Sequence, residues 1–287
     1  MRQGIKRIFE ECTNKEARNI TQIFEGFSNE NFLINDAYVL RLPLPNGDPT
    51  ISRKCEEEVY KVIQPLNISE KIEYFNSKSG IKITKYVHNP MKYQSTPTKE
   101  EILNVVKTLK KLHKSQIKVP FEYNAVKKLQ LYKKAITNDY YLDQKYEKII
   151  IKEYQKLQNK EDEVLCHNDL VKGNLLFKFN GLTIIDWEYA SMNSFYFDLA
   201  SFISENNLSD EQETFFLSKY FGYKYTNRKR KIVDSFIKFL DILFYYWGLY
   251  LYKKRGDQIY YSISLDKFNR IKKSMMEIKD IYLSDSL

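Results

Sequence analysis

The side chains with the clearest chemical potential lie in one stretch of the chain, residues 166–188. Within it His167, Asp169 and Asn174 form the pattern His-x-Asp-x4-Asn, and an apolar run follows that ends at Asp186. Phosphoryl transfer needs a carboxylate that accepts the proton of the attacking hydroxyl, and oxygen ligands for a Mg²⁺ ion that bridges the nucleotide phosphates. The pattern predicts Asp169 for the first role and Asn174 and Asp186 for the second. His167 completes the predicted catalytic group, by bracing the loop through hydrogen bonds rather than by titrating.

A hairpin is predicted to position these side chains. Two short apolar runs, 175–177 and 182–185, flank an Asn-Gly dipeptide, which is the strongest short signal for a hairpin turn. Such a hairpin would return the chain so that Asp186 lies beside Asn174.

Upstream of this segment the chain reads as a small β-rich region. The predicted elements are paired strands within 21–42 with a turn at Asn35-Asp36, a polar helix at 52–64 ended by Pro65, and two strands at 72–75 and 81–87. In outline, residues 1–88 form a β-β-β-α-β-β lobe.

Downstream the pattern changes to helices. The first predicted helix is 100–114, and its core-facing stripe consists of Leu103, Val106, Leu109, Lys110 and His113. A second helix is predicted at 144–157, and a third begins with a capping box at Ser209 and Gln212. Two long helices follow at 228–254 and 264–281, separated at Gly256-Asp257. We therefore expect an α+β fold of two lobes, residues 1–88 and 89–287, with a cleft between them.

Composition bounds the class of protein. The 287 residues carry 46 Lys or Arg against 37 Asp or Glu, a net charge of +9, and 43% of them are hydrophobic. The basic residues are spread along the chain, and the one tight cluster, 228–231, is typical of a solvated helix start, so no nucleic-acid partner is expected. Three scattered cysteines argue against a disulfide framework. The N-terminus lacks the apolar run of a signal peptide and 242–252 is too short to span a bilayer, so we expect a cytoplasmic protein.

These motifs resemble the kinase-like phosphotransferases that act on small molecules, and most closely the bacterial branch of the choline kinases. Residues 26–33 are similar to the family's loop over the nucleotide phosphates, although Gly26 is its single glycine. The strand 38–42 carries Arg41 where the family places the basic residue that reaches the phosphates. The helix start at 52–56 is similar to the one whose Glu pairs with that Arg, and Glu56, Glu57 or Glu58 fits this role.

The resemblance implies a protein-kinase-like fold, ATP as phosphoryl donor and Mg²⁺. Carried over by position, it implies a set of nucleotide-site residues: Ser28, Asn29, Asn31, Arg41, Glu56, Lys85 and Val87.

The acceptor pocket is expected from the same resemblance. A quaternary ammonium group donates no hydrogen bond, so a choline site depends on aromatic faces and carboxylates. The implied lining is Asp169, Glu188, Tyr189, Glu205, Trp247, Tyr250 and, from the pair 260–261, Tyr261. Tyr250 stands where a Trp is commoner, and most rings of 236–252 are expected to pack in the core.

The predicted activity is that of a choline kinase that uses ATP to make phosphocholine. The alternatives are a kinase for ethanolamine, thiamine or aminoglycosides, or a nucleotide-binding pseudokinase. The presence of Arg41, Asp169, Asn174 and Asp186 together argues against the pseudokinase. The sequence leaves open whether the protein is a monomer or a homodimer.

Overall fold

The structure is a computed structural model that describes residues 2–23, 29–45, 48–88, 90, 96–137, 140–179 and 181–284, with side chains described to residue 276. Its first part is an antiparallel five-stranded sheet of order β1-β2-β3-β5-β4. The strands are β1 (Ile20–Ile23), β2 (Asn29–Ile34), β3 (Tyr38–Pro43), β4 (Ile72–Phe75) and β5 (Lys82–Lys85). The predicted order of strands and helix, β-β-β-α-β-β, is confirmed for this region.

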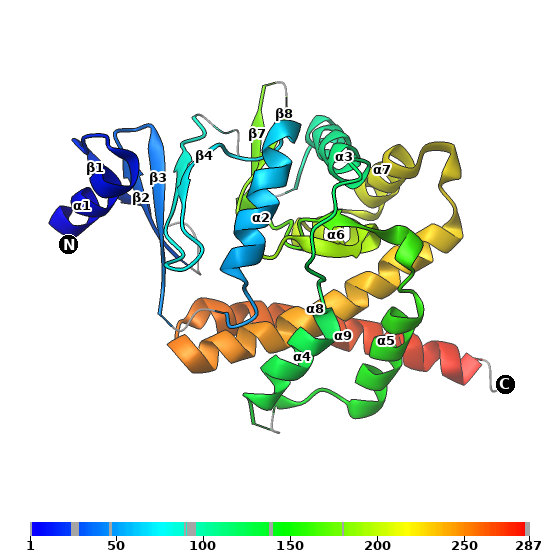
Figure 1. Cartoon of the computed structure of the whole chain (residues 1–287). Helices are drawn as coiled ribbons and strands as arrows, with labels where there is room; N and C mark the ends of the chain where they lie inside the picture. The colour runs from blue at the N-terminus through cyan, green and yellow to red at the C-terminus, as the bar shows by residue number, and fades with distance from the viewer. Residues whose placement is uncertain are drawn as a thin grey trace.

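A helix that the sequence analysis missed, α1 (Arg2–Thr13), covers the outer side of this sheet (Figure 1). Its Ile5 and Phe9 are buried in a small core together with Phe32, Leu40 and Ile83 of the strands. This core is separate from the larger one of the helical part.

Helix α2 (Arg53–Ile63) lies between the sheet and the helical part of the molecule (Figure 1). Ser52 caps its start by accepting a hydrogen bond from the N–H of Cys55. The short 3₁₀ helix η1 (Gln64–Leu66), which contains Pro65, follows directly after the last residue of α2. The buried residues Val59 and Ile63 of α2 belong to the large core, and Tyr60 contacts Phe75 of β4 with ring centres 6.2 Å apart, so α2 packs on both parts.

The remaining elements build the helical part. They are α3 (Lys99–His113), α4 (Ala125–Lys134), α5 (Gln144–Lys156), η3 (Lys160–Asp162), β6 (Glu163–Cys166), η4 (Lys172–Asn174), β7 (Leu175–Lys178), β8 (Gly181–Ile184), β9 (Ser191–Ser194), α6 (Phe195–Glu205), α7 (Asp210–Phe221), η5 (Gly222–Lys224), α8 (Asn227–Arg255) and α9 (Gln258–Ser284). Strand β7 pairs with β8 as the predicted hairpin, and β6 pairs with β9.

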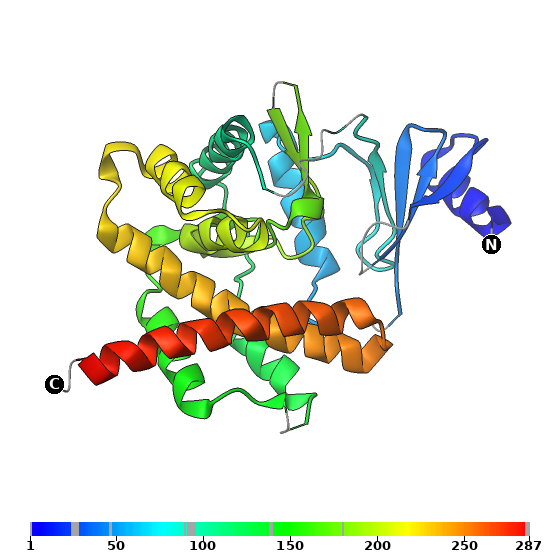
Figure 2. The same cartoon turned by 180° about the vertical axis from the view of Figure 1, so that it is seen from behind.

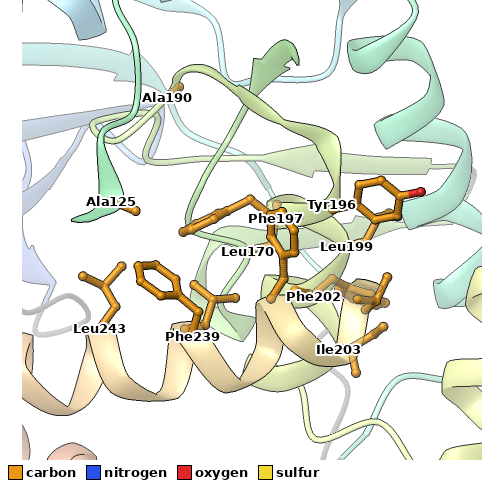
Figure 3. Packing of buried hydrophobic residues seen from close by; sticks show 14 of the residues in the cluster. Ala125, Leu170, Ala190, Tyr196, Phe197, Leu199, Phe202, Ile203, Phe239 and Leu243 are labelled. Atoms are coloured by element: carbon orange, nitrogen blue, oxygen red, sulfur yellow. The ribbon is translucent and has the colours of Figure 1, made fainter. Parts of the chain in front are cut away.

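The long helices α8 and α9 run side by side along the base of the molecule (Figure 2). Gly256 ends α8 with φ of 79°, a left-handed conformation that favours glycine, and the chain turns there into α9. Phe239 and Leu243 of α8 point toward α6, where Phe197 and Phe202 complete the centre of the large core (Figure 3).

Two features of the helical part differ from the sequence prediction. The core-facing stripe of α3 consists of Ile102, Val105, Val106, Leu109, Leu112 and His113, whereas Leu103 is 43% exposed. Helix α3 packs on α7 and on β6 at once, so its buried face is broader than the predicted stripe, and Leu103 lies outside that face. Helix α9 begins at Gln258, six residues before the predicted start at 264.

None of the helices in the described ranges is long and apolar enough to cross a membrane.

Candidate active site

A cavity of about 670 Å³ lies between the sheet and the helical part. Its walls come from β2, β3 and β5, from the segment 168–176, from the turn after β8, and from α4, α6, α8 and α9. Most of the residues singled out from the sequence meet here. They are Asn29, Asn31, Arg41, Lys85, Val87, Asp169, Asn174, Asp186, Glu188, Tyr189, Glu205 and Trp247.

The loop that carries Asp169 is held from behind by the buried carboxylate of Asp198 on α6. This carboxylate accepts hydrogen bonds from the backbone N–H of His167 at 2.9 Å and of Asn168 at 2.8 Å. Asn168 has a φ of 66°, so the chain bends sharply just before Asp169. Asp198 thus fixes the backbone from which the predicted catalytic side chain projects.

His167 does not line the cavity; it is fully buried under this loop. Its Nδ1 accepts a hydrogen bond from the N–H of Asp169 at 3.2 Å, and its Nε2 lies 3.0 Å from the carbonyl oxygen of Ile185 and donates to it. Burial lowers the pKa of His167 to about 4, so the ring is neutral at neutral pH. His167 thus has the bracing contacts expected from the sequence, and it positions Asp169 and the strand that leads to Asp186 from behind the cavity.

Asp169 faces the cavity, and Asn174 holds its carboxylate. The Nδ2 of Asn174 donates to Oδ2 of Asp169 at 3.0 Å and to its backbone oxygen at 2.9 Å. Burial, together with the neighbouring carboxylates of Asp186 and Glu188, raises the pKa of Asp169 well above its usual range. A carboxylate with a raised pKa is the stronger base, which suits it to accept a proton from a hydroxyl.

Asp186 follows β8 with φ of 63°, and its side chain reaches toward the sheet. Its Oδ1 lies 3.4 Å from Nη1 of Arg41. The hairpin therefore brings Asp186 to Asn174, as predicted; the backbone N–H of Ile185 donates to the carbonyl oxygen of Asn174 at 3.0 Å.

The partner of Arg41 is Glu56. The two groups form a two-pronged ion pair at 2.6 and 2.8 Å, with both side chains buried. Glu57 accepts a hydrogen bond from Ser77 instead, and Glu58 pairs with Lys61 at the surface. Of the three candidates, Glu56 is therefore the one that pairs with Arg41. Glu56 lies behind Arg41 rather than in the described lining of the cavity, so it acts on a ligand through the cations that it holds.

Lys82 is a residue of this site that the sequence analysis missed. It stands opposite Arg41 in the pairing of β3 with β5 and lines the cavity. Its Nζ lies 3.1 Å from Glu56 and 2.8 Å from the hydroxyl of Tyr60. Burial alone would raise the pKa of Glu56, but Arg41 and Lys82 outweigh it and lower that pKa below its ordinary range. The sequence feature that could have indicated Lys82 is its position in a short, mostly apolar predicted strand.

Asp169, Asn174 and Asp186 line the same cavity and carry side-chain oxygen atoms, and Glu188 adds a further carboxylate to the lining. Burial and the charge of Asp186 raise the pKa of Glu188 to about 7, although Arg41 and Arg53 oppose the shift. Crowded carboxylates that raise one another's pKa attract a cation, and carboxylate and amide oxygens are the ligands that Mg²⁺ prefers. The residues present fit a Mg²⁺ ion.

Two further residues predicted for the nucleotide site make hydrogen bonds with neighbouring side chains. Asn29 donates to Glu188 at 3.3 Å and accepts from Arg53 at 3.2 Å. Lys85 donates to the hydroxyl of Tyr38 at 2.8 Å. Ser28 lies outside the described residues.

The predicted acceptor residues divide into two groups. Glu188, Tyr189, Glu205 and Trp247 line the cavity, but two tyrosines do not belong to its described lining. Tyr250 is buried with its ring 5.4 Å from that of Tyr132, because α4 packs on this face of α8. Tyr261 is 38% exposed on the outer side of α9, with its ring against Tyr252. The structure therefore does not bring Tyr250 and Tyr261 to the described wall of the cavity.

Two further tyrosines take part in the wall instead. Tyr123, just before α4, and Tyr132, within it, line the cavity, and no motif in the sequence marks either. Glu205 is also ion-paired, because Nζ of Lys267 in α9 lies 2.6 Å from its Oε1.

The model of the phosphotransferase enzyme family matches residues 19–230. The chain belongs to this family. Among curated relatives of this phosphotransferase, Protein LicA of Haemophilus influenzae is 29% identical over 240 residues, which is 77% of this chain and 70% of LicA.

Solved structures of other phosphotransferases share its fold. The choline kinase LicA from Streptococcus pneumoniae aligns with a TM-score of 0.80 at 21% identity, covering 96% of this chain and 99% of that one. An aminoglycoside 2'-phosphotransferase-IIIa, solved as its GDP complex, aligns with a TM-score of 0.67 at 17% identity, covering 95% and 98%. The predicted α+β, two-lobed, protein-kinase-like fold is confirmed.

Proposed function

We propose that this phosphotransferase is a choline kinase, which transfers the γ-phosphoryl group of ATP to the hydroxyl of choline and yields phosphocholine. The observation that carries the proposal is that one cavity combines Arg41, Asp169 and Asp186 with an aromatic wall that includes Trp247 and Tyr189. The first set suits a nucleotide and its metal, and the wall suits a cationic head group. The likeness to LicA over most of the chain supports the same assignment.

The sheet lobe, residues 1–88, is proposed to bind the nucleotide. Arg41 is held by Glu56, so its guanidinium is already ordered and little entropy is lost when it meets a phosphate. Asn29 and Asn31 of β2 add polar side chains to the same wall. A structure of LicA in complex with AMP aligns with this chain with a TM-score of 0.77, which is consistent with a nucleotide at this place in the fold.

In the proposed reaction Asp169 orients the choline hydroxyl and accepts its proton as the oxygen attacks the γ-phosphorus. Asn174 keeps the Asp169 carboxylate in place through its amide, and His167 and Asp198 hold the loop. Asn174 and Asp186 are the residues that would hold Mg²⁺, which neutralises charge on the phosphates when bound. Arg41 adds a fixed positive charge near the same groups.

The acceptor end is proposed to hold the trimethylammonium group against aromatic faces. Trp247 is itself fixed by an edge-to-face contact with Tyr260, whose ring centre lies 5.6 Å away. A rigid ring loses little freedom on binding, which favours a cage for a cation that donates no hydrogen bond.

A phosphate-transfer assay tests the proposal. Purified protein with ATP and Mg²⁺ is offered choline, ethanolamine, thiamine and kanamycin in parallel, and product is followed by mass. We expect the highest kcat/KM for choline and no product from Asp169→Asn. A clear preference for ethanolamine, thiamine or kanamycin would replace the proposed acceptor, and ATP binding without transfer to any of them would contradict the assignment as a kinase of these alcohols.

A further inference from the structure

A buried carboxylate lies behind the aromatic wall of the cavity. Asp48, in the loop between β3 and α2, is 6% exposed. Its Oδ2 accepts hydrogen bonds from the hydroxyl of Tyr132 at 2.6 Å and from that of Tyr189 at 2.8 Å. Its Oδ1 accepts from the backbone N–H of Thr50 at 2.8 Å.

The two rings that Asp48 binds belong to the cavity wall, and they come from different elements. Tyr132 lies in α4 and Tyr189 in the turn after β8, and both line the cavity. One carboxylate of the sheet lobe therefore fixes two rings of the helical lobe. Burial and the charge of Asp48 raise the pKa of both phenols well above their usual range, so they stay protonated and continue to donate.

Unlike the other carboxylates at this end, Asp48 forms no ion pair with a described residue. Glu205 pairs with Lys267 at 2.6 Å, and Glu188 pairs with Arg53 at 3.0 Å. In the described part of the chain, Asp48 takes its hydrogen bonds from neutral donors only, two phenols and one amide.

The nearest cation, Lys128 of α4, does not donate to Asp48. Its Nζ donates to Oγ1 of Thr50 at 2.7 Å and lies over the ring of Tyr189, 5.0 Å from its centre. Lys128 lines a second, smaller cavity that shares Tyr189 as a wall with the large one. Asp48 is thus bound to the hydroxyl ends of rings that face the acceptor end of the large cavity.

Hydrogen bonds from phenols to a carboxylate have a consequence for a cationic ligand. A hydroxyl that donates to an anion is polarised, and polarisation passes along the chain of bonded groups. The ring then carries more negative charge on its face, which strengthens its attraction for a cation. The negative charge of Asp48 itself acts in the same direction at longer range.

We propose that Asp48 is a specificity-determining positioning residue, which sets Tyr132 and Tyr189 as a negatively polarised wall that selects a cationic over a neutral acceptor. The inference rests on the proposed function, since it names how the same site distinguishes its substrate. The rival explanation is that Asp48 only ties the β3–α2 loop to the helical lobe, together with Thr50 and Lys128.

A pair of acceptors of equal shape separates the two explanations. Choline and 3,3-dimethylbutan-1-ol have the same branched outline and the same hydroxyl, but only choline is charged. A residue that merely holds the fold affects both alcohols alike, whereas a residue that tunes the wall for charge affects choline more. The readout is the ratio of kcat/KM for choline to kcat/KM for the neutral alcohol.

The test variant is Asp48→Asn, which keeps the size of the side chain and an acceptor oxygen but removes the charge. We expect the ratio to fall by about tenfold, from loss of choline kcat/KM, because several weakened cation–π contacts act together on one ligand. The KM for ATP is expected to stay unchanged. Tyr189→Phe keeps the ring but removes the hydroxyl that donates to Asp48, so it should lower the ratio several-fold. This variant tests the inference if Asp48→Asn does not fold.

The matched control is Glu147→Gln. Glu147 is also a buried carboxylate that accepts from a tyrosine, Tyr246, at 2.9 Å, but it lies between α5 and α8 outside the described lining of the cavity. It should leave the ratio unchanged. An equal loss for both alcohols in Asp48→Asn, or an unchanged ratio in both cavity variants, would overturn the inference while leaving the proposed kinase intact. Wild-type protein that fails to phosphorylate choline would overturn the proposed function first.

Discussion

Asp169 lines the cavity with its carboxylate held by the side-chain amide of Asn174. Replacement by Asn keeps the shape and removes the base, so we expect Asp169→Asn to lower kcat by about 10²- to 10⁴-fold. Nucleotide affinity should change little, because Arg41 and Asp186 remain. Rapid-quench turnover and equilibrium nucleotide binding measure the two effects, and a near-native kcat would show that Asp169 has another role.

Replacing a proposed metal ligand should change how the activity depends on the Mg²⁺ concentration. Asp186→Ala removes an anionic oxygen, so we expect the Mg²⁺ concentration for half-maximal activity to rise at least tenfold, with weaker ATP binding. Asn174→Ala should show a smaller Mg²⁺ effect and a lower kcat, since it also releases the Asp169 carboxylate. Superimposable Mg²⁺ titrations for both variants and wild type would contradict the assignment.

The aromatic wall allows a comparison between a residue inside the cavity and one outside it. Trp247→Ala should raise the choline KM by about one order of magnitude and leave the KM for ATP unchanged, because one strong cation–π contact contributes roughly 0.5–2 kcal/mol. Tyr261→Ala, on the exposed side of α9, is the control and should alter neither value. An effect of Tyr261→Ala equal to that of Trp247→Ala would place the head group elsewhere.

The residue scale also shows what a sequence can predict of a site. Asp169, Asn174 and Asp186 were predicted from a short spacing and one hairpin, whereas Arg41 was predicted from the resemblance to a known family. The resemblance also implied Tyr250 and Tyr261, which do not reach the described wall, because the face of a helix that meets a cavity depends on its neighbours. Contact with α4 decides this for Tyr250. Asp48 gave no signal, since its role arises from rings that are distant in the chain.

At the scale of elements, the close contact of α8 with α9 depends on Gly248. A Cβ at this position would lie 2.7 Å from the carbonyl oxygen of Tyr260 in α9, too close for the two backbones to keep their separation. We expect Gly248→Ala to lower the free energy of unfolding by about 1–3 kcal/mol, the usual cost of overpacking. Urea denaturation measures the change.

Gly4 offers the control for this substitution. It lies in α1, and a Cβ there would meet no atom within 4 Å. Gly4→Ala should leave stability unchanged or increase it by up to about 1 kcal/mol, because alanine favours the helix. A Gly248→Ala protein as stable as Gly4→Ala would mean that α8 and α9 can separate at no cost.

Elements with a local signal were predicted, and those without one were not. The hairpin β7–β8 has its Asn-Gly turn, and α7 shows both hydrogen bonds of the capping box that Ser209 and Gln212 indicated. Helix α6 was missed because it is buried almost all round and shows no alternation of polar and apolar faces. Strand β9 (Ser191–Ser194) is wholly buried yet mostly polar, so burial there follows from pairing with β6 rather than from hydrophobic pattern.

At the scale of the whole molecule, stability should depend on pH through Glu213. This carboxyl of α7 faces Arg230 of α8 at 3.1 Å. Burial raises its pKa from 4.5 to about 7, although Arg230 opposes the shift. Between these two values the folded protein binds more protons than the unfolded chain does, so stability falls as the pH rises through this window.

Glu213→Gln tests this dependence, because the amide does not titrate. Melting temperatures of the wild type should drop by a few degrees between about pH 5 and about pH 7.5, and the variant should show a smaller drop. Equal slopes for the two proteins would show that other groups govern the pH response.

The cluster of charges around Glu56 has a consequence for how such an enzyme is regulated. Kinases that are turned on and off by moving the equivalent helix assemble this ion pair only in their active state. Here Glu56 is held by Arg41, Arg53 and Lys82 at 2.6 to 3.1 Å. An outward swing of α2 would leave Arg41 and Lys82 of the sheet buried without their shared carboxylate, at a cost of several kcal/mol. These ion pairs therefore oppose a movement of α2 away from the sheet.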